Sequence, residues 1–350
     1  MLKSRVLLGM SGGTDSAVSA MLLKEQGYEL VGITFLFTDY SENNRNIIQD
    51  ASELADDLKI EYHIIDLREE FEDKIIKKFN QDYLLGKTPF PCAFCNPDLK
   101  FKNLIIYSEK FDCQYIATGH YAKIVEYNEV KFIAQGANKN KDQSFFLWSL
   151  KNEIINKLIF PLGNWNKEKV RDFAKQHGYI KISHKKDSLG ICFIDGGDYR
   201  NWLKDRGISS EQGNFIDKDG KVLGKHKGIV NYTIGQRHGL GINTNKRLFV
   251  AEIKSKENII VLDEYDSLFK TRIYVKDINL IDFQSFSQNK AYILKIRYRL
   301  QENPCYVKII DNNRAILELL KPVAMVANGQ AAVLYEENRL IGGGFIEKSE

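Results

Sequence analysis

Short apolar runs alternate with helical patterns along the first 200 residues of the chain. The apolar runs that predict buried strands are residues 6–10, 30–37, 62–65 and 115–118. Residues 15–26 and 47–58 between them have the spacing of helices, and Gly27 follows the first helix as a C-cap. Strands that alternate with helices predict an open parallel α/β sheet, which binds ligands at the carboxyl ends of its strands.

The pattern changes after about Trp202, where glycines become frequent and few helical periods remain. Residues 208–270 predict a small β-rich module. Further strand patterns, separated by polar turns, follow at residues 292–300, 306–310, 315–320 and 331–335. They predict a C-terminal β-barrel, with a sandwich as the alternative. We therefore expect three domains, at residues 1–203, 204–271 and 272–350.

The composition is that of a globular protein, with 43% hydrophobic and 27% charged residues among 350. No apolar run approaches the ~18 residues that predict a membrane span, so we expect no membrane partner. The apolar stretch near the N-terminus, residues 6–10, is too short for a signal-peptide core. These features predict a cytoplasmic protein.

Positive charge is concentrated in two segments, although the net charge of the whole chain is only +4. Residues 131–186 contain twelve Lys or Arg against four Asp or Glu, and residues 218–247 contain seven against one. Such clusters can bind a phosphate backbone, or they can simply be solvated basic faces.

The strongest local signal is Ser-Gly-Gly-Thr-Asp-Ser at residues 11–16, between the first predicted strand and the first helix. Glycines let backbone N–H groups approach a phosphate, and a helix N-terminus favours negative charge. Asp15 could cap the helix or help to hold Mg²⁺. The alternative is a plain glycine turn with a serine or aspartate N-cap. Neither the Walker A pattern nor the Rossmann pattern is present here.

The five cysteines, an odd number in a chain without a secretion signal, argue against a disulfide framework. Cys92 and Cys95 form a C-x-x-C pair, and Cys192 lies between Ile191 and Phe193, two apolar neighbours that on their own favour a buried core cysteine. Metal binding or thiol chemistry is the better interpretation of these three. Cys113 and Cys305 are expected to be packing residues, because a free cysteine behaves as a small hydrophobe.

The loop at residues 11–16 resembles the PP-loop of the N-type ATP pyrophosphatases. Eight further stretches accompany it, and together they resemble the tRNA-specific 2-thiouridylase family, MnmA, over nearly the whole chain. The stretches are residues 88–102, 118–124, 141–147, 160–163, 185–194, 231–242, 296–299 and 328–346. This resemblance implies a PP-loop adenylating domain, a β-rich domain and an RNA-binding barrel.

The family resemblance implies that the chain thiolates a tRNA uridine, at the wobble position, at C2. ATP would convert the carbonyl oxygen, a poor leaving group, to an adenylate with release of pyrophosphate, and a sulfur nucleophile would then replace that oxygen with release of AMP. Mg²⁺ would accompany the ATP. A cysteine desulfurase or a relay protein would be the sulfur donor.

The resemblance also assigns residues to these partners. Those expected to contact ATP are Gly9, Met10, Ser11, Gly12, Gly13, Thr14, Asp15, Ser16, Phe35 and Gly119. Those expected to contact RNA are Phe90, Pro91, Cys92, His120, Lys141, Asp142, Gln143, Arg297, Tyr298 and Gln330. Phe35 could instead be a core residue of the sheet, and His120 could have a purely structural role.

The resemblance makes Cys192 the carrier of the persulfide sulfur and Cys95 the partner that releases it through a transient disulfide. Many family members have Asn-Pro-Asp where this chain has Phe90-Pro91-Cys92, so an acidic residue is missing. Three interpretations of Cys92 remain open. It could take part in the thiol chemistry, it could hold an iron–sulfur cluster or another metal with Cys95 and Cys192, or it could be a bystander.

Three other functions are compatible with the motifs. One is a PP-loop synthetase that acts on a small molecule, which would need neither paired cysteines nor basic clusters. Another is sulfur transfer to a different RNA base, which the departure at residues 90–92 keeps open. The third is a metal-bearing RNA-binding module without catalysis, against which the intact Ser11, Asp15 and Ser16 argue.

Overall fold

The computed structural model describes residues 4–39, 42–185, 190–194, 198–298 and 302–350. The chain divides into two compact units, and each is described by itself. Unit 1 comprises Met1–Lys74, Cys92–Leu189 and Glu337–Ile341, and unit 2 comprises Ile75–Pro91, Gly190–Glu336 and Gly342–Glu350. Within the described ranges, no helix combines the length and the apolar character needed to cross a membrane.

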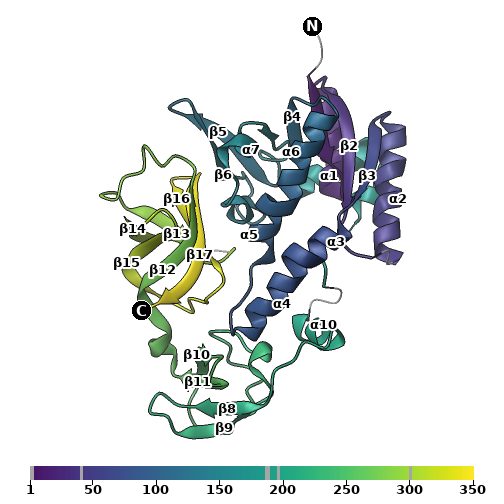
Figure 1. The fold of residues 1–350 in the computed structure, drawn as a ribbon. Coiled ribbons are helices and arrows are strands. Elements are labelled where there is room, and N and C mark those ends of the chain that lie inside the picture. Colours follow the sequence, from purple (N-terminus) through teal and green to yellow (C-terminus); the bar gives the residue numbers. More distant parts are fainter. Residues whose placement is uncertain (1–3, 40–41, 186–189, 195–197, 299–301) are drawn as a thin grey trace. The chain divides into compact units, whose positions relative to one another are not determined.

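A five-stranded sheet of order β3-β2-β1-β4-β7 forms the centre of unit 1 (Figure 1). Its strands are β1 (Arg5–Gly9), β2 (Glu29–Leu36), β3 (Glu61–Asp66), β4 (Tyr115–Thr118) and β7 (Leu158–Ile159). All four pairings are parallel, and such pairs need long crossover connections, which accounts for the helices between the strands. The predicted parallel α/β sheet is confirmed.

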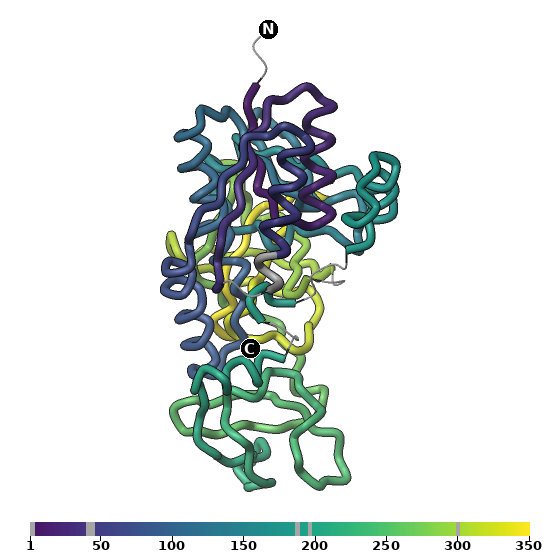
Figure 2. The backbone as a smooth tube through the Cα atoms, turned by 90° about the vertical axis from the view of Figure 1, so that its right-hand side faces the viewer, coloured from purple at the N-terminus to yellow at the C-terminus, as the bar shows by residue number. Residues whose placement is uncertain are grey.

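Helices cover both faces of this sheet (Figure 2). Val6 and Leu8 of β1, and Met10 just after it, pack in one apolar cluster with residues of α1 (Thr14–Glu25) and α2 (Glu42–Asp57). The opposite face of the strand is covered by α6 (Phe101–Lys110), which contacts β1 and β4. Burial on both faces explains why these strands are continuous apolar runs in the sequence.

The remaining short helices of unit 1 connect these elements. They are α3 (Arg68–Phe71), η1 (Glu72–Ile76, which continues into unit 2), α5 (Pro91–Cys95, of which Pro91 belongs to unit 2), η2 (Asn96–Lys100), η3 (Ser144–Leu147), α7 (Asn152–Ile155), α8 (Lys167–Gln176) and α9 (Ile180–Ser183).

Unit 1 also contains an antiparallel hairpin that the sequence patterns did not predict. It pairs β5 (Ala122–Tyr127) with β6 (Val130–Gln135), and both turn residues, Asn128 and Glu129, have positive φ. Two such residues are typical of the tight turns whose twist matches that of the paired strands.

A four-stranded sheet of order β10-β11-β8-β9 forms part of unit 2. Its strands are β8 (Gly213–Ile216), β9 (Val222–His226), β10 (Phe249–Lys254) and β11 (Ile259–Asp263). Their core includes Phe215, Val250 and Ile260, all completely buried. The helices of this part are α4 (Lys77–Leu84), α10 (Tyr199–Asp205), η4 (Ile229–Asn231) and η5 (Tyr265–Leu268).

A closed six-stranded antiparallel β-barrel completes the chain, and it confirms the predicted barrel. The strands follow the order β12-β15-β14-β13-β16-β17, and pairing of β12 with β17 closes the ring. They are β12 (Phe269–Leu280), β13 (Tyr292–Lys295), β14 (Asn303–Ile309), β15 (Arg314–Ala324), β16 (Ala331–Glu336) and β17 (Arg339–Ser349). A Cβ at Gly342 would lie 2.1 Å from the Asn279 carbonyl oxygen, so glycine there permits the closing contact.

Two predicted elements differ from the structure. The strand predicted at residues 292–300 ends at Lys295, the following segment to Tyr298 bends, and residues 299–300 lie outside the described residues. The helix predicted at 47–58 is observed to begin earlier, at Glu42. The sequence pattern missed its first turn because that turn is polar and lacks an apolar period. The three-domain division at residues 1–203, 204–271 and 272–350 stays a prediction.

Candidate active site

The segment that connects β1 to α1 presents an open helix N-terminus. Helix α1 begins at Thr14, and its N-cap, Gly13, has no side chain that could bond the N–H groups of the first turn. The Ser16 hydroxyl donates to the Gly13 carbonyl at 3.1 Å and accepts from the Ser11 N–H at 3.2 Å. The first turn is therefore uncapped, and a phosphate could be its partner.

Two glycines allow the backbone to fold closely around this loop. Gly12 has φ +64°, and a Cβ there would lie 2.3 Å from the Ile47 carbonyl oxygen. Gly119 follows β4, beside the end of β1, and a Cβ there would lie 2.9 Å from the Ser16 nitrogen. Any side chain at either position would push the loop out of place.

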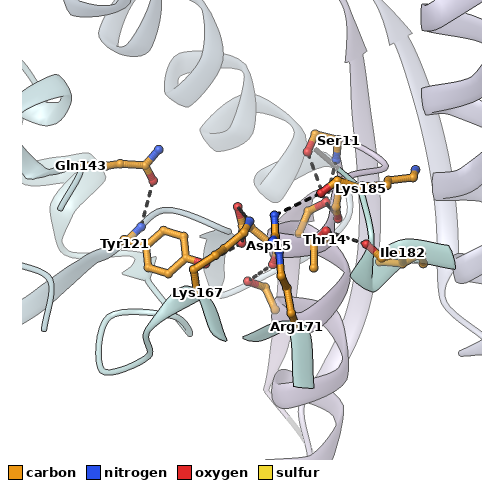
Figure 3. A network of polar contacts seen from close by, with 12 residues as sticks. Ser11, Thr14, Asp15, Tyr121, Gln143, Lys167, Arg171, Ile182 and Lys185 are labelled. Carbon is orange, nitrogen blue, oxygen red and sulfur yellow. Dashed lines mark hydrogen bonds and ion pairs between the residues drawn. The ribbon is translucent and has the colours of Figure 1, made fainter. Parts of the chain in front are cut away.

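Asp15 is held by a polar network that joins distant parts of the chain (Figure 3). The Lys167 ammonium lies 2.8 and 2.9 Å from its two carboxylate oxygens, and the Tyr121 hydroxyl donates to Oδ1 at 2.6 Å. Tyr121 is fixed in turn by Gln143, whose Oε1 accepts from the Tyr121 N–H at 3.0 Å and whose N–H donates to the Tyr121 carbonyl. The carboxylate therefore has a fixed orientation beside the loop.

Ile182 of α9 and Lys185, just after that helix, also form hydrogen bonds with the loop. The Thr14 hydroxyl donates to the Ile182 carbonyl at 2.6 Å, and the Lys185 ammonium donates to the Gly12 carbonyl at 2.5 Å. Lys185 also pairs with Asp50. Burial would raise the pKa of Asp50, but hydrogen bonds from Lys185 and Lys181 outweigh it and lower that pKa. Asp50 is thus ionised and positions the Lys185 cation at the loop.

Cys95 lies in unit 1, at the end of α5, on a short helix anchored to the segment after Gln143. The Ser149 hydroxyl donates to the Ala93 carbonyl at 2.6 Å, and the Asn96 amide donates to the Phe146 carbonyl at 2.7 Å. Cys95 itself is buried and Cys92 is half-buried. Residues 143–149 thus form hydrogen bonds both with Tyr121, which holds Asp15, and with the short helix that carries the Cys95 thiol.

Cys192 lies in unit 2 and is exposed, on a turn after the described residue Gly190. The next residue, Phe193, is buried and packs edge-on against Phe79 at a ring distance of 5.2 Å. A core role for Cys192 is therefore excluded, and an anchored aromatic neighbour presents the thiol to solvent. Cys113 and Cys305 are buried, and burial raises their thiol pKa values to about 11 and about 12, as expected for packing residues.

His120 follows Gly119 and is kept neutral. Its ring lies near Phe101 and Phe160, at centroid distances of 5.8 and 6.1 Å, and its Nδ1 is 2.7 Å from the Thr118 hydroxyl. Burial, with a smaller contribution from the Lys100 charge, lowers its pKa from 6.5 to about 3. A neutral imidazole can donate or accept a hydrogen bond but cannot attract a phosphate by charge.

This pKa predicts a measurable pH dependence of stability. The unfolded chain takes up a proton on His120 below about pH 6.5, whereas the folded chain does so only near pH 3. Stability is therefore lost as the pH falls through this window, with a slope of up to ~1.4 kcal/mol per pH unit from this one group. In urea unfolding, His120→Gln should show a shallower acid decline than the native chain. Near pH 7.5 the difference in unfolding free energy between the two proteins reports only the packing that His120→Gln loses. If both proteins lost stability with the same slope below that pH, the lowered pKa of His120 would be contradicted.

Several residues expected to contact RNA are bonded to the protein itself. Asp142 is buried and accepts from the N–H groups of Gly136 and Ser144, both at 3.1 Å. The Gln330 amide donates to the Thr88 and Pro89 carbonyls at 3.1 Å, and Arg297 donates to the Met325 carbonyl at 3.0 Å. These bonds give each residue a structural role, and RNA contact stays a prediction for them.

For the other residues expected to contact ATP or RNA, the structure gives the burial of the side chain, and the contact itself stays a prediction. Phe35 is half-buried in β2, with its ring 6.0 Å from that of Phe37 and 6.4 Å from that of Tyr107, so both of its interpretations stay open. Phe90 and Pro91 are buried, whereas Lys141 and Tyr298 are half-buried.

Sequence reasoning missed the residues that hold the loop, namely Tyr121, Lys167, Lys185 and Asp50. Lys167 lies 152 positions from Asp15, in a helix whose only obvious sequence features are its charges. Tyr121 and Lys185 fall inside stretches that resemble the family, which is the signal that could have singled them out.

In the part of the chain that the structure describes, no group of three His, Cys, Asp or Glu side chains is arranged to hold a metal ion. Cys92 and Cys95 belong to unit 1 and Cys192 to unit 2, so an iron–sulfur cluster held by these three thiols stays a prediction.

Comparison with known proteins covers the whole chain. Three models of one family match in order: a tRNA methyl transferase HUP domain at residues 4–196, a tRNA methyl transferase PRC-barrel domain at 200–263, and an aminomethyltransferase β-barrel domain at 270–346. The chain is 40% identical to tRNA-specific 2-thiouridylase MnmA 1 of Clostridium tetani, over 100% of this chain and 98% of that protein. It is 41% identical to MnmA 1 of Bacteroides fragilis strain YCH46, over 99% and 98% of the two chains. Identity to MnmA of Cytophaga hutchinsonii is 38%, with the same coverage as for the B. fragilis protein.

These relatives match this chain over 99–100% of its length. The identification made from the motifs is confirmed, and the chain belongs to the tRNA-specific 2-thiouridylase family.

Proposed function

We propose that this protein replaces the C2 oxygen of a tRNA uridine with sulfur, in a reaction that consumes ATP and releases AMP and pyrophosphate. The observation that carries the proposal lies within unit 1. Residues 143–149 bond both Tyr121, which holds Asp15 of the loop, and the short helix that ends in Cys95. A nucleotide loop and a thiol therefore share one hydrogen-bonded framework, as coupled adenylation and sulfur transfer require.

ATP would bind with its phosphates at the uncapped N-terminus of α1. Residues 11–16 offer backbone N–H groups and the hydroxyls of Ser11 and Ser16, and the Lys185 ammonium lies at the Gly12 carbonyl. The remaining proposed contacts are Gly9, Met10, Phe35 and Gly119. Mg²⁺ would enter on the phosphates, since it usually keeps several waters and needs few protein ligands.

The proposed chemistry has two stages. The uridine C2 oxygen attacks the α-phosphate of ATP, which forms a C–O–P linkage and expels pyrophosphate. Cys192 carries a persulfide, and the Cys95 thiolate attacks its inner sulfur, which forms a Cys95–Cys192 disulfide and releases hydrosulfide. The hydrosulfide then displaces AMP from C2 and loses its proton. A cellular thiol reductant must return the disulfide to two thiols before the next turnover.

The sulfur donor is proposed to be a cysteine desulfurase or a relay protein, which would load Cys192 where it is exposed to solvent. We place the reaction in the cytoplasm, on the wobble uridine, with RNA gripped by the C-terminal barrel. Cys92 remains a second participant in thiol exchange, a ligand of an iron–sulfur cluster or another metal with Cys95 and Cys192, or a bystander. Iron and acid-labile sulfide analysis of anaerobically purified protein tests for an iron–sulfur cluster. None of the proposed steps requires one.

One alternative is supported by a specific observation. Phe90-Pro91-Cys92 stands where many family members have Asn-Pro-Asp, so one acidic residue is missing, and Phe90 and Pro91 are buried. A changed base pocket would permit sulfur transfer to a different RNA base.

Nucleoside mass spectrometry of tRNA and ribosomal RNA, from cells with and without the gene, tests the proposal. We expect 2-thiouridine in tRNA to disappear with the gene and to return with the native gene on a plasmid. The same measurement would reveal a thiolated cytidine or a methylated base instead. Unchanged 2-thiouridine, in cells without a second copy, would overturn the proposal.

The Asp15 network predicts the effect of removing its cation. In Lys167→Met, the Asp15 carboxylate loses its ion pair and repels the phosphates, so we expect ATP to bind about tenfold more weakly. Isothermal titration with ATP and Mg²⁺ measures this. A matched double variant, Asp15→Asn with Lys167→Met, removes the uncompensated charge and should recover part of the loss. Equal affinity of Lys167→Met and the native chain would contradict the prediction.

A further inference from the structure

Unit 2 contains a hollow of about 750 Å³ that the proposed chemistry does not use. It lies between α10 and the loop around η4 and the glycine-rich residues 235–241. Four of its eight lining residues are Arg200, Lys227, Arg237 and His238, and none is Asp or Glu. The hollow is therefore a cationic concavity on a unit separate from the ATP loop.

The walls of the hollow are held in place by hydrogen bonds. The Arg200 Nε donates to the Asn231 carbonyl at 2.9 Å, and its guanidinium stacks over the Tyr199 ring at 4.8 Å. The Gln236 side chain accepts from the Thr233 N–H at 3.2 Å and donates to the His238 carbonyl at 2.9 Å. These bonds fix the loop that carries the outer cations.

A glycine fixes the same loop to the barrel side of unit 2. Gly235 has φ +83°, and a Cβ there would lie 2.8 Å from the Met325 Cγ. The loop thus approaches Met325 as closely as glycine allows, which limits its freedom to close or spread.

The charges of the outer cations are not balanced within the described part of the chain. Lys227 and Arg237 are exposed, and no described residue forms a hydrogen bond or an ion pair with their side chains. Arg200, in contrast, has an acidic neighbour, Asp198, whose Oδ1 lies 3.6 Å from its guanidinium. Unpaired cations around a preformed hollow create a positive potential that favours an anion.

We propose that this hollow binds a phosphate of the RNA backbone, and this inference rests on the proposed function in taking RNA as the substrate. The Lys227 ammonium and the Arg237 guanidinium can donate to phosphate oxygens, while Arg200, which donates to the Asn231 carbonyl at 2.9 Å and to Gln236 Oε1 at 3.4 Å, holds the wall of the hollow. A nucleotide phosphate shares this chemistry, and the experiment separates the two.

The test compares two double variants of the full-length protein. Lys227→Ala with Arg237→Ala removes two cations of the hollow, and Lys218→Ala with Lys221→Ala removes two exposed cations of the same unit outside the lining. Binding of bulk tRNA is measured by fluorescence anisotropy over a range of salt concentrations. We expect the first variant to bind about tenfold more weakly, with a salt slope smaller by roughly 1 to 2, and the control to keep the native slope.

Titration with ATP and Mg²⁺ separates a nucleotide site from an RNA site. We expect unchanged ATP affinity in both variants. Lost ATP affinity with an unchanged tRNA salt slope would overturn the proposal in favour of a nucleotide site. Equal slopes in the two double variants would overturn it as well.

A second measurement needs no substitution and so does not depend on folding of a variant. Lysines of the native chain are acylated with and without tRNA and quantified by mass spectrometry. We expect tRNA to slow acylation of Lys227 several-fold while Lys218 and Lys221 keep their rates. Equal protection of all three would contradict a specific site. Binding and footprinting do not require turnover, so they can succeed or fail whether or not the chain thiolates uridine.

Discussion

Replacing Cys192 with serine should abolish thiolation, by about 10³-fold or more, while ATP-dependent adenylation of tRNA continues. A serine hydroxyl has nearly the same size but cannot carry a persulfide. Because Cys192 is exposed, the substitution removes no core packing, and the melting temperature should stay unchanged. Mass spectrometry of 2-thiouridine and release of AMP measure the two stages separately.

Two companion variants make this result specific. Cys95→Ser should also block sulfur release but should allow Cys192 to be loaded with persulfide, which alkylation and mass spectrometry detect. Cys113→Ala removes a buried thiol that lies outside every motif and should retain thiolation, with only a modest loss of stability. A Cys192→Ser protein that still transferred sulfur would remove this residue from the mechanism.

Gly12→Ala should weaken ATP binding by about 100-fold and lower the free energy of unfolding by about 2 kcal/mol or more. The φ of +64° at Gly12 is costly for alanine, and its Cβ would lie 2.3 Å from the Ile47 carbonyl oxygen. The loop can relieve this overlap only by moving away from α2. Urea unfolding without nucleotide and titration with ATP measure the two effects.

Gly13→Ala is the matched control for stability, one residue further along the same loop. Gly13 has φ −89°, and its Cβ would meet only the Ser11 hydroxyl oxygen, at 3.5 Å. The free energy of unfolding of Gly13→Ala should change by less than about 1 kcal/mol. If both variants were equally stable, the close approach of Gly12 to α2 would not be the reason for its glycine.

Much of the fold followed from local patterns. The strand predicted at residues 115–118 is observed as β4, and the helix predicted at 15–26 is α1 within one residue at each end. Buried parallel strands are continuous apolar runs, so they are easy to find. The patterns missed β12 and β17, whose pairing closes the barrel, because β17 contains three consecutive glycines and β12 contains few apolar runs.

The candidate site was predictable only where a motif is contiguous. The order of residues 11–16 is enough to predict a phosphate loop, because a glycine turn before a helix lets backbone N–H groups bind an anion. Lys167 and Asp50 have no such local signature. Their importance comes from where the chain places them, beside Asp15 and Lys185.

The sequence by itself determined the parallel sheet, the phosphate loop at its edge, the two basic segments and the family to which the chain belongs. These are local or linear properties, set by hydrophobic period, glycine positions and ordered motifs. Only the tertiary structure decided that Lys167 and Tyr121 hold Asp15, that His120 stays neutral, that Cys192 is exposed while Cys95 is buried, and that unpaired cations surround a hollow in unit 2. Burial and charge pairing depend on neighbours that are distant along the chain, and folding alone brings those neighbours together.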